Sequence, residues 1–172
     1  TATDNCGGTI TPTLVSGGAS GSTFTGTSTV VWSATDAAQN MATCSFTVSV
    51  SDGQAPTISC PVAGAVTRST NVNDCFYTVV GNEFNATGSD NCGAPTITYA
   101  VSGATTGTGT SLAGVGLNKG TNTIVWTATD AGGNTAICSF TVQVNDTRPP
   151  VVSCPPSQTV NAAANACGAT VN

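Results

Sequence analysis

The stretch Ile124–Val144, IVWTATDAGGNTAICSFTVQV, decides the fold of this chain. Apolar side chains recur at every second position on both of its halves: Ile124, Trp126 and Ala128, then Cys138, Phe140, Val142 and Val144. This alternation is typical of strands that lay one face on a core. Asp130–Asn134, between the halves, is rich in residues that favour turns. The stretch therefore predicts a β-hairpin.

Nearly the same text occurs earlier, at Val30–Val50, VVWSATDAAQNMATCSFTVSV. The spacing between the two copies is constant, because Asp36 and Asp130 are 94 residues apart, as are Cys44 and Cys138. A second repeated motif is DNCG, at Asp4 and again at Asp90, where the spacing is 86 residues. We interpret the chain as tandem copies of one structural unit.

Two proline-containing segments, Ser51–Pro56 and Asn145–Pro150, mark the boundaries between copies. They divide the chain into residues 1–51, the C-terminal part of one repeat, 52–146, a complete repeat, and 147–172, the N-terminal part of a third. The third begins as the second does, with SCP at Ser153 and at Ser59. Because the chain opens in the middle of the pattern, we expect it to be part of a longer protein.

Short strands separated by turn signals are expected throughout the complete repeat. We predict them at Thr57–Cys60, Cys75–Val80 and Thr96–Val101, in addition to the hairpin, and no segment shows the 3.6-residue period of a helix. About seven short strands in such a length are typical of a sandwich. The predicted fold is all-β, with tandem immunoglobulin-like β-sandwich repeats.

The Gly- and Thr-rich segment Ser102–Gly120 holds the 8 residues by which the second repeat exceeds the first between DNCG and the tryptophan strand. We expect a surface connection of variable length there. The alternative is a loop that contacts a ligand, since long loops on sandwiches often bind.

Charged side chains are rare, and this excludes several classes of partner. They make up 6% of the chain, with 8 acids against 3 scattered bases and a net charge of −5. Such a surface is not expected to bind nucleic acid or anionic membranes. No apolar run is long enough to cross a bilayer, so membrane insertion is not expected either.

The 8 cysteines and the absence of histidine favour disulfides over a zinc site, and disulfides indicate an oxidising, extracellular compartment. Four cysteines in one unit allow three connectivities. If the units are equivalent and no thiol is left over, the consistent pairing is Cys6–Cys44, Cys60–Cys75, Cys92–Cys138 and Cys154–Cys167.

Aspartates recur at equivalent positions of successive units, and they are the candidate metal ligands. Asp36 and Asp130 lie in the hairpin turns, and Asp52 and Asp146 lie at the junctions. If turn and junction share one end of the sandwich, their carboxylates can bind Ca²⁺, which takes six to eight oxygen ligands. The alternative is that each aspartate forms an Asx-turn with its own backbone.

Catalysis is not expected. The chain has no histidine, and its one glutamate, Glu83, is interpreted as a solvated or turn-capping residue. Trp32 and Trp126 occupy equivalent positions and are predicted to pack in the cores against a disulfide between the sheets. A carbohydrate-stacking role would require them to be exposed.

Four ordered motifs give the chain a resemblance to a known family: PTISCP at Pro56, SDNCG at Ser89, ATDAGGN at Ala128 and CSFTVQVND at Cys138. Together they resemble the hyalin repeat (HYR) family. The resemblance implies immunoglobulin-like repeats arranged in tandem in extracellular proteins, including large bacterial surface adhesins and filaments, without a shared catalytic residue.

The expected function is that of a structural and adhesive repeat segment in a long extracellular surface protein, stalk or filament. Its expected partners are neighbouring repeats of the same protein, other copies in a fibre, and extracellular protein or glycan surfaces. The alternative function is an accessory carbohydrate- or ligand-binding module of a secreted enzyme.

Overall fold

The computed structural model describes residues 1–162, 164, 165, 167 and 168, and the secondary structure of these residues is entirely β. No helix among them has the length and apolarity needed to cross a membrane. The strands are β1 (Ala2–Asp4), β2 (Gly8–Ile10), β3 (Thr13–Ser16), β4 (Thr27–Thr35), β5 (Met41–Ser49), β6 (Thr57–Ser59), β7 (Ala65–Ser69), β8 (Phe76–Thr78), β9 (Thr87–Ser89), β10 (Thr96–Gly103), β11 (Gly107–Gly109), β12 (Gly116–Asn118), β13 (Gly120–Thr129) and β14 (Thr135–Asn145).

The predicted hairpin is confirmed as β13 and β14, which pair antiparallel along their whole length. Alternate residues of β13 are fully buried, among them Ile124, Trp126 and Ala128. In the turn, the backbone N–H groups of Gly133 and Asn134 donate to the carbonyl and the carboxylate of Asp130. Gly133 adopts a φ of 87°, a left-handed conformation that glycine tolerates well.

The hairpin forms the middle of a five-stranded sheet with the order β11-β10-β13-β14-β7, in which β7 runs parallel to β14. Two shorter pairs, β6 with β9 and β8 with β12, complete the unit. The buried side chains of one core all come from this unit: Val79, Phe84, Tyr99, Val101, Leu112, Leu117, Ile124, Trp126, Phe140, Val142 and Val144. Residues 52–146 thus carry a hydrophobic core of their own.

The segment Ser102–Gly120 is more than a variable surface connection. It contains β11 and β12, and its Leu112 and Leu117 are fully buried in the core. These two leucines belong to the hydrophobic core, although the segment around them is rich in Gly and Thr. The expectation of a surface connection is therefore wrong for Leu112 and Leu117, which are buried.

Residues 1–50 repeat the hairpin in the same register. Trp32 pairs with Cys44 as Trp126 pairs with Cys138, and every partner in β4 and β5 lies 94 residues before its counterpart in β13 and β14. The strand β3 pairs with β4 as β10 pairs with β13. The internal repeat predicted from the sequence is confirmed at the level of strand pairing.

Trp32 is only half-buried, in contrast to Trp126. Hollows of about 460 and 320 Å³ lie beside its ring, and Phe46 is 54% exposed whereas its counterpart Phe140 is 3% exposed. The three-stranded sheet β3-β4-β5 is not packed against counterparts of β6, β8 and β9 within the described residues. Within the described part of the chain, the apolar face of this sheet is half-buried at Trp32 and exposed at Phe46.

The predicted cysteine pairing is corrected by the structure. A disulfide joins Cys60 to Cys138, with their Cα atoms 5.8 Å apart, which excludes the predicted bonds Cys60–Cys75 and Cys92–Cys138. Cys6, Cys44, Cys75, Cys92, Cys154 and Cys167 are free and exposed, so the predicted bonds Cys6–Cys44 and Cys154–Cys167 are not formed either. The predicted pairing assumed that every cysteine has its disulfide partner within this chain, and this assumption gave the wrong bonds.

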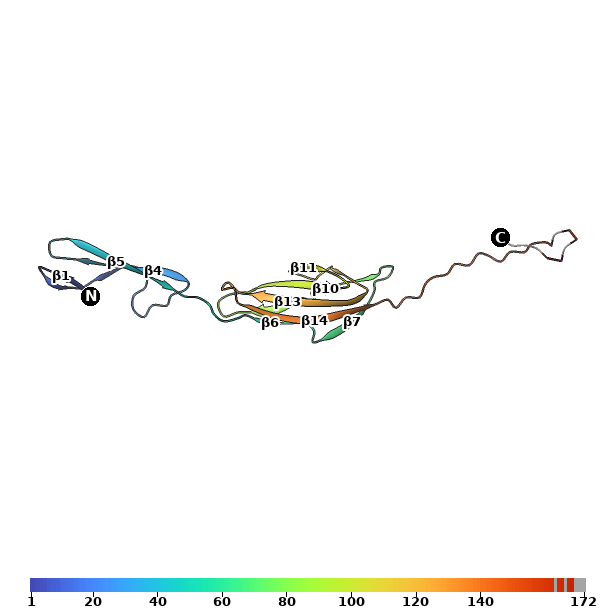
Figure 1. Cartoon of the computed structure of the whole chain (residues 1–172), viewed down its shortest axis with the longest axis horizontal. Helices are drawn as coiled ribbons and strands as arrows, with labels where there is room; N and C mark the ends of the chain where they lie inside the picture. The colour runs from blue at the N-terminus through green and yellow to red at the C-terminus, as the bar shows by residue number, and fades with distance from the viewer. Residues whose placement is uncertain (163, 166, 169–172) are drawn as a thin grey trace.

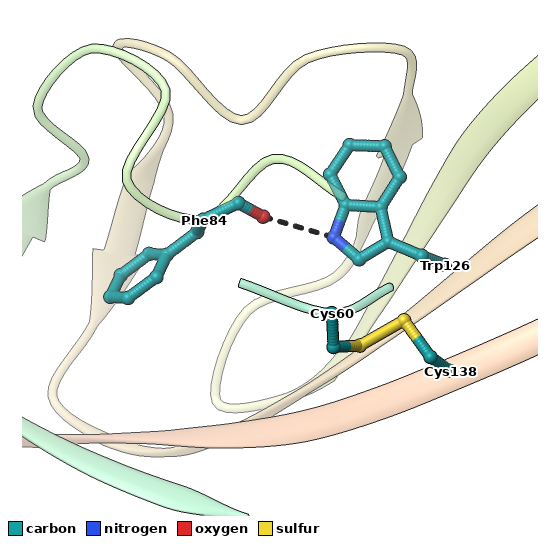
Figure 2. Close-up of a disulfide and its surroundings, with 4 residues drawn as sticks. All are labelled: Cys60, Phe84, Trp126 and Cys138. Atoms are coloured by element: carbon teal, nitrogen blue, oxygen red, sulfur yellow. Dashed lines mark hydrogen bonds between the residues drawn. A yellow bond between two sulfur atoms is a disulfide. The ribbon is translucent and has the colours of Figure 1, made fainter. Parts of the chain in front are cut away.

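The bond between Cys60 and Cys138 connects the end of β6 to β14, and thus joins the two layers of the sandwich (Figure 2). Trp126, the neighbour of Cys138 across the ladder, is buried beside it, and its indole N–H donates to the carbonyl oxygen of Phe84 at 3.0 Å. The predicted role of Trp126 as a core residue next to an inter-sheet disulfide is confirmed.

The parts of the chain follow one another along its longest axis (Figure 1). The β3-β4-β5 sheet lies at one end, the complete sandwich lies in the middle, and residues 147–162 extend away from it. Residues 147–162 form no strand, and Val151 and Val152 are exposed. The boundaries at residues 51/52 and 146/147 stay a prediction.

Candidate functional site

The two ends of the complete unit carry most of its chemically distinctive side chains. We call the end that holds Asp52, Asp90, Cys92 and the turn Asp130–Asn134 the N-terminal pole. We call the end that holds Cys75, Lys119, Asn145 and Asp146 the C-terminal pole. The strand β14 runs from the first pole to the second, because Thr135 follows the turn and Asn145 precedes Asp146.

At the N-terminal pole, the junction and the hairpin turn are held together by hydrogen bonds. The side-chain amide of Asn134 donates to the carbonyl oxygen of Asp52 at 3.1 Å and to the carboxylate of Asp130 at 2.8 Å. The expectation that turn and junction share one end of the sandwich therefore holds for Asp52 and Asp130.

The aspartates of the hairpin turns are engaged by their own loops. Both carboxylate oxygens of Asp130 accept hydrogen bonds from Asn134, and both oxygens of Asp36 accept the same bonds from Asn40. These hydrogen bonds, the one from the asparagine side chain first, lower the pKa of both carboxyl groups. The Asx-turn alternative describes both residues.

The two junction aspartates lie at different poles. Asp52 accepts a hydrogen bond from the backbone of Gln54, and Asp146 accepts the equivalent bond from Arg148. Asp146 is also 3.8 Å from the ammonium of Lys119 in an exposed ion pair. The four predicted ligands, Asp36, Asp52, Asp130 and Asp146, are therefore not gathered into one site.

The cluster that the structure does assemble was only partly anticipated. Ligand atoms of Asp52, Asp90 and Cys92 all lie within 4.8 Å of one another. Asp90 accepts a hydrogen bond from the backbone N–H of Cys92 at 2.9 Å. A hydrogen bond to Asp52, then burial and the charges of Asp52, Asp90 and Asp130, raise the pKa of the Cys92 thiol. The recurrence of DNC in both units was the signal that pointed to this cluster.

At the C-terminal pole, Cys75 lies at the start of the β8 segment. Its carbonyl oxygen accepts a hydrogen bond from the backbone N–H of Lys119 at 3.0 Å. Nearby, Asn145 at the end of β14 accepts a bond from the backbone of Thr70. Cys75 thus lies beside the junction that leads to residue 147.

Of the two interpretations of Glu83, the turn-capping one is confirmed, because its carboxylate accepts a hydrogen bond from the backbone N–H of Val80 at 3.0 Å. The solvated one is wrong, because the side chain is partly buried. Its carboxylate accepts hydrogen bonds from Arg68 at 2.8 Å and from the hydroxyl of Tyr77. The Arg68 guanidinium lies over the ring of Phe84, 5.1 Å from its centroid. This half-buried cluster covers the core side chain Phe84, so its role is in stability.

Comparison with known proteins identifies the first segment. Residues 1–50 match the family model of the HYR domain. The resemblance to HYR repeats is thereby confirmed for residues 1–50, and it supports an extracellular, adhesion-type repeat module of a non-enzymatic kind.

The HYR segment and the complete unit share their hairpin register residue by residue, as described above. Among solved structures, one match is the protocadherin gammaB7 EC3-6 cis-dimer, at 14% sequence identity and a TM-score of 0.34. The alignment covers 80% of this chain and 41% of that one. No curated protein matches the sequence.

Proposed function

We propose that this chain is a segment of a long extracellular stalk or filament, built from tandem HYR-type units and serving a structural and adhesive role. The observation that carries the proposal is the identical strand register of β4/β5 and β13/β14 at a spacing of 94 residues. Units that repeat in this way along one axis can be added without changing the others.

The proposed division is residues 1–51 as the C-terminal part of one unit, 52–146 as a complete unit and 147–172 as the start of the next. Short joints containing proline restrict the motion of neighbouring units. Translation-related units with equivalent surfaces also suit open, end-to-end or lateral association into fibres. The proposed partners are therefore neighbouring units, other copies, and extracellular protein or glycan surfaces.

The proposal is tested by measuring length. A chain made of residues 1–146 followed by a second copy of residues 53–146 reproduces the native joint after Asp146. Small-angle scattering should show the maximum dimension increasing by about one sandwich length, roughly 35–40 Å for eleven β residues and their turns. A compact particle with an unchanged maximum dimension would contradict the array.

The alternative, a ligand-binding module of a secreted enzyme, lacks a platform in the segment that suggested it. Ser102–Gly120 holds no aromatic residue, and its Leu112 and Leu117 are buried. We therefore keep the structural function as the conclusion.

We also propose that Ca²⁺ binds at the N-terminal pole, on Asp52 and Asp90. Asp130 stays bound to its turn. Asp36 is the counterpart of Asp130 in the preceding unit, and Asp146 is the counterpart of Asp52 at the following joint. Each ligand retains one carboxylate oxygen that makes no backbone bond. Ca²⁺ should raise the melting temperature and EDTA should reverse the change, whereas Asp52→Asn should abolish it and Asp146→Asn should not. Melting that is insensitive to EDTA rules the site out.

A further inference from the structure

We propose that Cys75 forms a disulfide with the counterpart of Cys92 in the following unit, so that a covalent bond crosses each joint of the array. This inference rests on the proposed tandem arrangement. It accounts for two exposed thiols that the disulfide between Cys60 and Cys138 leaves free.

The two thiols cannot pair within one unit. Cys75 lies at the C-terminal pole beside Lys119, and Cys92 lies at the N-terminal pole beside Asp52. The 11 residues of β14 separate these poles, a distance of about 36 Å at 3.3 Å per residue. A disulfide requires Cα atoms within about 7 Å.

Because successive units are equivalent, Cys75 of one unit and the Cys92 counterpart of the following unit lie at the same joint. Asp52 and Asp146 are equivalent junction residues, 94 apart, and each accepts a hydrogen bond from the backbone two residues later. The sulfur of Cys92 lies within 4.8 Å of a carboxylate oxygen of Asp52, the first of these two residues. The carbonyl oxygen of Cys75 accepts a hydrogen bond from the backbone N–H of Lys119. The ammonium of Lys119 lies 3.8 Å from the carboxylate of Asp146. A unit that continues after Asp146 as residues 53–146 continue after Asp52 therefore brings its own Cys92 counterpart to the joint at which Cys75 lies.

The bond forms by exchange with a disulfide donor, such as oxidised glutathione or an oxidised dithiol oxidoreductase. The Cys75 thiolate attacks one sulfur of the donor and releases the other as a thiol. The Cys92 counterpart then attacks the Cys75 sulfur and releases the second donor thiol. The two protein thiols are oxidised to one S–S bond, and the donor disulfide is reduced to two thiols, which take up the two protons.

The test uses residues 1–146 followed by a second copy of residues 53–146, oxidised at low concentration in a glutathione buffer. In one variant, Cys6→Ser and Cys44→Ser are combined with Cys92→Ser in the first copy and Cys75→Ser in the second, so that the only free cysteines are the pair that faces the middle joint. In the matched control, Cys6→Ser and Cys44→Ser are combined with Cys75→Ser and Cys92→Ser in the second copy, so that the free cysteines are the pair of one unit. Digestion before aspartate separates Cys75, in residues 74–89, from Cys92, in residues 90–129.

We expect the peptides 74–89 and 90–129 to be joined in the first variant and both thiols to react with an alkylating agent in the control. Free thiols in the first variant, or joined peptides in the monomeric control, would overturn the inference. Small-angle scattering of the same chain separates this outcome from the proposed function, because an elongated particle with free thiols keeps the array and refutes only the bond.

Discussion

At the scale of single residues, the cluster of Arg68, Tyr77 and Glu83 shows how few charges this fold uses and where it uses them. Glu83 is the one glutamate among 8 acids, and it accepts bonds from both partners and from the backbone of Val80. Burial raises the pKa of Glu83, but the hydrogen bonds outweigh it, so that the pKa lies below 4.5. The carboxylate is therefore held charged against the core.

Removal of this charge should destabilise the complete unit. Glu83→Gln leaves Arg68 half-buried without its anion, and we expect a loss of about 1–2 kcal/mol in the free energy of unfolding. Urea titration followed by tryptophan fluorescence measures the change. Lys119→Gln, which removes the exposed pair with Asp146, is the control and should cost less than about 0.5 kcal/mol. Equal losses in the two variants would contradict the structural role of the cluster.

The same residue predicts a dependence of stability on pH. A carboxyl group whose pKa is lower in the folded than in the unfolded state stabilises the fold above its unfolded value, and this stabilisation is lost as the pH falls through the folded value. The contribution of Glu83 should therefore be constant above about pH 5 and decline below 4.5. Because Asp36 and Asp130 titrate in the same direction, the difference between wild type and Glu83→Gln isolates Glu83. A difference that does not shrink with acid would contradict this assignment.

At the scale of strands, the hairpin was predictable because its alternation of apolar and polar residues reports burial directly. The short strands β7, β9, β11 and β12 were not, because three to five residues rich in Gly, Ala and Thr carry too little periodicity. The fold is set by where such segments pair. The parallel contact of β7 with β14 depends on residues more than 70 positions apart, which no local pattern encodes.

The bond between Cys60 and Cys138 follows from the same long-range pairing. It closes a loop with a sequence separation of 78 and should contribute about 4 kcal/mol in the loop-entropy account. Cys138→Ser should lower the free energy of unfolding by about that amount, measured by urea titration of the oxidised protein. Cys44→Ser, the equivalent change at a free cysteine in the first segment, should leave the main transition unchanged. A reducing agent should reproduce the effect of Cys138→Ser, and any additional loss in that variant under reducing conditions would indicate a packing role.

At the scale of the whole chain, the sequence predicted the repeat, but it did not predict which residues meet at each pole. The repeat placed Asp52 and Asp146 at equivalent positions, and the two residues accept equivalent hydrogen bonds from the backbone. Which residues meet at one pole depends on strand direction. Asp90 joins Asp52 because β9 runs toward the N-terminal pole, antiparallel to β6. Cys75 is carried to the other end by the same strand order.

The distribution of the core predicts that the complete unit folds alone. Every residue of the main core lies between Val79 and Val144, and the half-buried hydrophobic residues that pack against it begin at Ile58. A fragment of residues 52–146 should therefore unfold with the same urea midpoint as the main transition of the full chain. Residues 1–50, whose sheet leaves Phe46 exposed, should show no cooperative transition by themselves.

The contrary result is equally informative. If the fragment 52–146 unfolds at a lower urea midpoint than the full chain, contacts across the joint stabilise the unit, and the array is coupled rather than a sum of independent units. Because the two tryptophans lie in different segments, Trp32→Phe and Trp126→Phe assign each fluorescence transition to its segment. If the urea midpoints of the fragment and of the full chain agree, each unit is stable independently of its neighbours. Units can then be added to the array without changing the stability of the others.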